Sequence, residues 1–225
     1  MIRSLALIFL MHLCWHSSAQ VPHHPDDPYY VSGGAINIAV SALDASEGNA
    51  FFSAAEQNEK DGDYNEAVML FSKAAFEYNS AKQLSRYGSA LMRLSNVHYL
   101  LNNYTEAEQV VLNVALKNYT KLGSRSGQME SYGQLGKIYL AANKLTQSLW
   151  FYTQQGILAR QLGSSSGNIE SVLGIAKVKV KKKEYVMASR DVNHAELLAK
   201  AANIRQFSDQ IREVRSQISV SRKKS

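Results

Sequence analysis

Residues 127–162 read GQMESYGQLGKIYLAANKLTQSLWFYTQQGILARQL, and this stretch decides the fold. Apolar and small residues recur there at helical intervals, at Tyr132, Leu135, Gly136, Tyr139, Ser148 and Tyr152. Such intervals place side chains on one face of an α-helix. The tripeptide Ala142-Asn143-Lys144 interrupts the pattern, so the stretch predicts two helices joined as a hairpin.

The hairpin recurs along the chain. The second helix of each copy opens in DYNEA, NYTEA, KLTQS or EYVMA, and the openings at Tyr64, Tyr104, Leu145 and Tyr185 are 40, 41 and 40 residues apart. A small residue follows three positions after each opening, and another stands twelve positions before that one: Ala67, Ala107, Ser148 and Ala188, preceded by Ala55, Ser95, Gly136 and Ala176. Small residues on both helices allow close packing, so we expect Gly136 to lie against a neighbouring helix. A hairpin of this kind cannot bury its apolar face alone, so neighbouring copies must stack.

These residues resemble the tetratricopeptide repeat, in which an aromatic residue, Leu-Gly and Tyr precede Ala, Phe and Ala. The third copy matches best, whereas His98 and Lys179 stand where the family has Tyr. The period is longer than the usual 34 residues, and it is similar to the long-period form found in exported bacterial proteins, such as those of Bacteroidetes. The resemblance implies an all-α fold, a right-handed α-solenoid of about four hairpins over residues 46–202, with a C-terminal capping helix.

The first 19 residues have the character of a secretory signal peptide. Arg3 precedes an apolar run over residues 5–13, and Ser17-Ser18-Ala19 offers the small residues of a cleavage site. The run is short for a bilayer span, although a retained anchor is the alternative. We therefore expect export to the periplasm or secretion. Residues 20–45, with all three prolines, predict an extended segment and then a short helix over 35–43.

A last helix is predicted over residues 203–219, followed by a basic tail over 220–225. Its apolar residues alternate at intervals of three and four: Ile204, Phe207, Ile211, Val214 and Ile218. This stripe either packs on the fourth hairpin as a cap or forms a coiled coil between two copies. Because Arg205, Arg212 and Arg215 flank it with few acids, a parallel pair would bring like charges together, which favours the cap and a monomer.

Residues 177–183, KVKVKKK, alternate as a β-strand does. Their phase in the repeat instead places them in the first helix of the fourth hairpin. A lone strand would have no partner, so we expect a helix.

The sequence predicts three kinds of helix boundary. Gly123 and Gly163 suit left-handed C-terminal caps, and the serines after them suit N-caps. Asp63-x-x-Glu66 and Asn103-x-x-Glu106 have the pattern of capping boxes.

The sequence contains no recognisable catalytic set. It has no Gly-rich phosphate loop and no nucleophile elbow. His23, His24, Asp26 and Asp27 have metal-binding side chains, but a solvated tail is the favoured interpretation. We expect neither an enzyme, nor a cofactor, nor a metal site. The formal charge of +6 is modest and, together with export, speaks against a nucleic-acid partner. No later apolar run is long enough for stable membrane insertion.

In the repeat family, the first helices of the hairpins line a concave groove. Carried onto this sequence, that arrangement predicts the partner-binding residues Arg93, Asn96, Lys137, Lys177 and Lys181. The groove would become basic toward its C-terminal half and would suit an acidic segment or a C-terminal carboxylate. The resemblance therefore implies an exported, non-catalytic adaptor that binds a protein or peptide segment. The alternative is a sensor-type module that acts with a separate signalling partner, as a homodimer through its C-terminal helix.

Overall fold

The computed structural model describes residues 33–223, and every regular element in that range is helical. The elements are α1 (Gly33–Asp61), α2 (Tyr64–Ser80), α3 (Leu84–Leu100), α4 (Tyr104–Gln109), η1 (Val110–Ala115), α5 (Leu116–Lys121), α6 (Arg125–Ala141), α7 (Leu145–Gln161), α8 (Ser165–Lys181), α9 (Tyr185–Ala201) and α10 (Ser208–Lys223). Because α4, η1 and α5 run on without a break, residues 33–223 form nine continuous helices. The predicted signal peptide and the His23–Asp27 segment lie outside the described residues.

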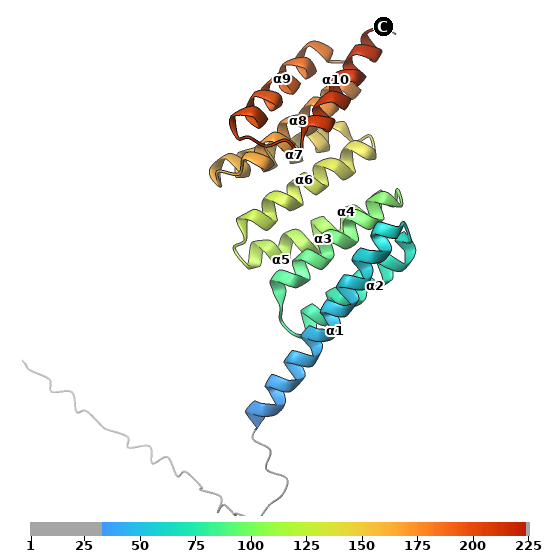
Figure 1. Ribbon diagram of the computed structural model, residues 1–225, viewed down its shortest axis with the longest axis vertical. Helices are drawn as coiled ribbons and strands as arrows, with labels where there is room; N and C mark the ends of the chain where they lie inside the picture. The colour runs from blue at the N-terminus through green and yellow to red at the C-terminus, as the bar shows by residue number, and fades with distance from the viewer. Residues whose placement is uncertain (1–32, 224–225) are drawn as a thin grey trace, which may run out of the picture.

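The helices stack in chain order into an elongated molecule, with α1 at one end and α9 and α10 at the other (Figure 1). Each core cluster draws its buried side chains from three successive helices. Ala55, Phe71 and Val97 join α1, α2 and α3, for example, and Leu173, Val192 and Ile211 join α8, α9 and α10. This nearest-neighbour packing makes the fold all-α and solenoid-like, as expected from the repeated hairpin. None of the helices in this stack is both long and apolar enough to cross a membrane.

Every link between two helices contains one residue in the left-handed conformation. Eight residues have φ between 54° and 88°: Gly62, Lys82, Asn102, Gly123, Asn143, Gly163, Lys183 and Asn203. The N–H of the next residue donates back to the preceding helix, as Ser124 does to the carbonyl of Tyr119 at 2.9 Å. This is the Schellman arrangement, and it confirms the caps predicted at Gly123 and Gly163.

The helices that follow these links start in two ways. Ser124 and Ser164 have extended backbones, and their hydroxyls accept the N–H three residues on, as predicted. Asp63 and Asn103 make no side-chain cap, so the predicted capping boxes are wrong. Their ψ angles are 61° and 67°, and the N–H of the following residue donates to the carbonyl two residues before it, at 2.9 Å in both. This tight inverse γ-turn replaces the extended backbone from which a capping side chain reaches the helix.

The single 41-residue spacing has a structural counterpart inside the second hairpin. The second helices of the other hairpins, α2, α7 and α9, have 17 residues each. The helix from Tyr104 to Lys121 has 18, made of three six-residue segments. Its middle segment, η1, is a π-helix, the geometry by which a helix takes in one extra residue without breaking.

Tyr152 of α7 fills the space where α6, α7 and α8 meet. A Cβ atom added to Gly136 of α6 would lie 2.8 Å from its ring, and one added to Gly174 of α8 would lie 2.4 Å away. Carbon atoms in contact are normally about 3.5–4.0 Å apart, so only glycine permits both approaches. The Ser148 hydroxyl also donates to the Gly136 carbonyl at 2.7 Å. The close contact predicted at Gly136 is confirmed.

α10 packs on the last hairpin, and its apolar stripe is buried there. Phe207, Ile211, Val214 and Ile218 share one core cluster with side chains of α8 and α9. The predicted packing of this stripe within the chain is therefore confirmed, but the predicted bounds are wrong: the helix begins at Ser208, not at residue 203, and runs to Lys223, into the predicted basic tail.

The other two helix predictions have different outcomes. α8 continues to Lys181, so the lysine-rich stretch is helical up to that residue, as its repeat phase predicted. α1 runs without interruption from Gly33 to Asp61, so residues 35–43 begin a long helix and do not form a short separate one. Residues 35–47 contain no proline or glycine that would end the helix earlier.

Candidate functional site

A cavity of about 350 Å³ opens beside α6 and α8, the first helices of the third and fourth hairpins. Its lining comes from α3, α6, α7, α8 and α10: Tyr99, Lys137, Tyr152, Glu170, Leu173, Gly174, Lys177, Gln210 and Glu213. The cavity brings together Lys137 and Lys177, two of the five predicted binding residues. Their helices pack on one another, so two residues 40 positions apart in the sequence face the same space.

Neither lysine of the cavity makes an ion pair with an acid of the described residues. The Lys137 Nζ lies 5.3 Å from the ring centroid of Tyr99, a cation–π contact. Burial lowers the pKa of Lys137, Glu170 opposes that shift, and Lys177 reinforces it. None of the ion pairs in the described part of the chain involves Lys137 or Lys177. Their ammonium groups therefore share the cavity with the carboxylates of Glu170 and Glu213 without a direct ion pair.

The two acids of the cavity are already hydrogen bonded. Glu170 accepts a bond from the Gln155 side-chain amide at 2.7 Å, and Glu213 accepts one from the Gln217 amide at 2.9 Å. The lining thus carries charges of both signs, where the sequence predicted a basic groove. Burial, followed by the nearby Glu170, raises the pKa of the Tyr152 hydroxyl, so this group stays protonated and able to donate.

Arg93 and Asn96 do not line the cavity but hold α3 to α1. The Arg93 guanidinium pairs with Glu59 at 2.7 Å, and the Asn96 amide donates to the same carboxylate at 2.8 Å. Glu56 lies 3.6 Å from Arg93 and adds a weaker contact. Through these contacts the structure gives both residues a role in packing between the first two hairpins.

Lys181 also makes a contact within the chain. Its Nζ donates to the Leu140 carbonyl at 3.0 Å, near the C-terminal end of α6. A lysine there stabilises the negative end of the helix dipole. This bond joins α8 to α6 next to the cavity.

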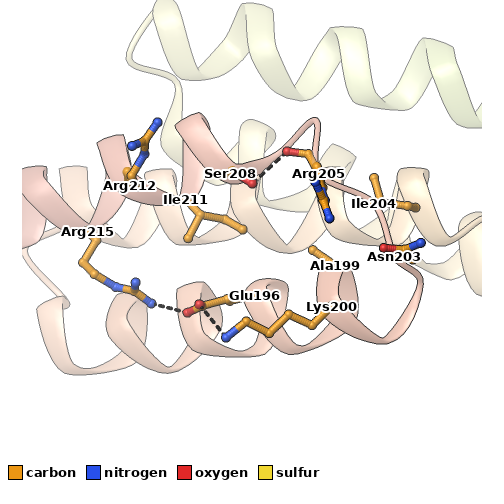
Figure 2. A pocket seen from close by; sticks show the side chains of 10 residues that line it. All are labelled: Glu196, Ala199, Lys200, Asn203, Ile204, Arg205, Ser208, Ile211, Arg212 and Arg215. Atoms are coloured by element: carbon orange, nitrogen blue, oxygen red, sulfur yellow. Dashed lines mark hydrogen bonds and ion pairs between the residues drawn. The ribbon is translucent and has the colours of Figure 1, made fainter.

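A second cavity, of about 560 Å³, lies between α9 and α10 (Figure 2). It is lined by Glu196, Ala199, Lys200, Asn203, Ile204, Arg205, Ser208, Ile211, Arg212 and Arg215. Glu196 bonds to Arg215 at 2.7 Å and to Lys200 at 2.9 Å. These bonds, the one from Arg215 first, lower the pKa of Glu196 to about 2. Four cationic side chains thus share this cavity with a single carboxylate.

The sequence contained a signal for some of the cavity residues that were not predicted. Glu170 lies seven residues before Lys177, two helical turns along the same face, and Tyr99 lies three residues after Asn96. If the predicted groove had been extended along these helices by one or two turns, it would have included both residues. Gln210 and Glu213 had no such signal, because their place depends on how α10 packs against α8 and α9.

Within the described residues, no three side chains of the His, Cys, Asp and Glu types form a metal-binding group. Comparison of the sequence with models of known protein families and with curated proteins gave no match.

Proposed function

We propose that this chain is an exported, non-catalytic adaptor built from about four tetratricopeptide-like hairpins in a right-handed solenoid. We propose further that it binds a protein or peptide segment on the face that carries the Lys137–Lys177 cavity. The observation that supports this function is the pair of unpaired lysines in a cavity whose own acids are already hydrogen bonded. The repeated hairpin and the sequential stacking support the fold.

The ligand that best fits the cavity is an extended segment with at least one carboxylate. Lys137 and Lys177 would bind that carboxylate, and the protonated Tyr152 hydroxyl would donate to a neighbouring carbonyl. Leu173 and the ring of Tyr99 offer apolar contact beside the charges. Glu170 and Glu213 would repel a second acidic group, so a uniformly acidic segment fits less well than one with spaced acids.

The buried stripe of α10 argues for a monomer and against the sensor-type dimer. A coiled coil needs the same apolar residues that α8 and α9 already cover, with Ile211 and Val214 each no more than 5% exposed. We therefore propose that α10 ends the stack within one chain.

Peptide display on the purified protein tests this function. Selected peptides should be enriched in spaced Asp and Glu residues, and Lys137→Glu with Lys177→Glu should weaken their binding about tenfold or more. Lys117→Glu with Lys121→Glu is the matched control, because it changes the net charge equally at two exposed positions of α5. If both double variants weaken peptide binding equally, the effect comes from the net charge of the protein and not from the cavity. If binding survives Lys137→Glu with Lys177→Glu, the peptide site lies elsewhere.

A further inference from the structure

The cavity between α9 and α10 lies outside the site described above and shares no lining residue with it. Its volume of about 560 Å³ is within the range of small-molecule sites. Figure 2 shows its wall formed by one face of α9, one face of α10 and the link between them.

The charges around this cavity are unbalanced. Glu196 is the one carboxylate in the lining, and it is shared by Arg215 and Lys200. Arg212 pairs with Asp209, which is not part of the lining. Arg205 takes part in none of the ion pairs found among the described side chains. Even with Asp209 counted, the site retains an excess of positive charge.

The cavity also has an apolar floor. Ala199 and Ile211 are buried, and Ile204 is partly buried against the same core cluster. In Figure 2, the Arg205 side chain extends from the link toward this floor. An apolar body could rest on Ile204 and Ala199 while its charged end meets Arg205, since the Arg215 guanidinium is already bonded to Glu196 and Asn193. Arginine is the residue best suited to bind a carboxylate through two parallel hydrogen bonds.

We propose that the α9–α10 cavity binds a small aliphatic carboxylate, with its acid group on Arg205 and its chain on the apolar floor. A cation of the same shape would be repelled by the excess positive charge. A carboxylate without a chain would lose the apolar contact, which contributes about 0.8 kcal/mol for each buried methylene group.

The experiment is a titration of the full-length chain, labelled with nitrogen-15, with octanoate, octylammonium and acetate in turn. Amide shifts should move on adding octanoate, in residues 196–215 and little elsewhere. Acetate and octylammonium should give at least tenfold weaker responses at the same concentrations. Equal responses to octanoate and octylammonium, or octanoate shifts spread over the whole chain, would overturn the proposal.

Two variants make the test specific. Arg205→Ala removes a side chain with no ion-pair partner in the described chain, so stability should not change and octanoate affinity should fall about tenfold. Arg190→Ala, at an exposed position of α9 outside the cavity, is the matched control and should leave affinity unchanged. An unchanged affinity in Arg205→Ala would refute the assignment of the acid group. The Lys137→Glu and Lys177→Glu pair should not affect octanoate, so this proposal and the proposed peptide site can fail independently.

Discussion

Gly174→Ala should destabilise the protein, although the same change at an open helical site stabilises it. Alanine is favoured over glycine in a helix interior by about 1 kcal/mol. Here the new Cβ would lie 2.4 Å from Cε1 of Tyr152, more than an ångström inside normal contact. The ring cannot retreat, because Gly136 lies against it on another helix, where an added Cβ would lie 2.8 Å away. Overpacking of this kind costs about 1–3 kcal/mol, so we expect a net loss of up to about 2 kcal/mol after the propensity gain is subtracted.

A double-mutant cycle with Tyr152→Val measures this contact directly. Valine is the residue at the matching point of the second and fourth hairpins, Val111 and Val192. In the Tyr152→Val background the ring is gone, so Gly174→Ala should be neutral or stabilising by up to about 1 kcal/mol. The coupling free energy should then be about 2 kcal/mol, obtained from urea unfolding followed by circular dichroism. If Gly174→Ala stabilises both backgrounds equally, the Tyr152 ring does not lie between α6 and α8 and the packing described here is wrong.

Three further predictions concern pH and the end of the stack. Burial lowers the pKa of His98, and its Nδ1 has no hydrogen-bond partner in the described chain, so folding favours the neutral ring. The contribution of His98 to the free energy of unfolding should be fully present above the unfolded pKa of about 6.5 and should fall as the pH drops below it. The variant His98→Gln should therefore reduce the difference in Tm between pH 7.5 and pH 5. The matched change at an exposed position, His194→Gln, should not. The Glu196 carboxyl has a pKa of about 2 against an ordinary value of 4.5, so its contribution is present above about pH 4.5 and is lost as the pH falls toward 2. Because this carboxylate is partly exposed, Glu196→Gln should only slightly speed hydrogen exchange in α10, and high salt should remove the difference. Ile211→Asp buries a charge in the core cluster shared by α8, α9 and α10. It should lower the free energy of unfolding, measured with urea, by about 3 kcal/mol or more. If the variant instead kept its stability and its mass in light scattering were halved, α10 would form a dimer.

The sequence was sufficient to predict the fold where the repeated hairpin determines it. The spacing of 40, 41 and 40 residues located the hairpins, and its one irregular interval marks the hairpin that holds η1. Gly123 and Gly163 predicted their left-handed caps because few residue types tolerate that backbone. The repeat phase also overruled the strand-like alternation of residues 177–181.

The sequence was insufficient where the outcome depended on contacts between repeats. Asp63 and Asn103 fit the capping pattern, but their backbones adopt a tight turn with ψ near 60–70° in place of the extended conformation from which a side chain caps a helix. Arg93 was assigned to the binding groove because its charge was visible, while its partner Glu59 stands on α1, 34 residues earlier. Lys137 and Lys177 line one cavity, and both follow the small residue of their helix by one position; their part in binding stays a prediction.

The central claim is that the face with the Lys137–Lys177 cavity binds the partner segment. Photo-crosslinking tests it most directly, with p-benzoylphenylalanine placed at Tyr99, inside the cavity, or at Trp150, a half-exposed residue of α7 outside it. A display-selected peptide should crosslink from position 99 and not from position 150, and excess unlabelled peptide should suppress the product. Crosslinking from position 150 alone, or equal crosslinking from both positions, would contradict the proposed site.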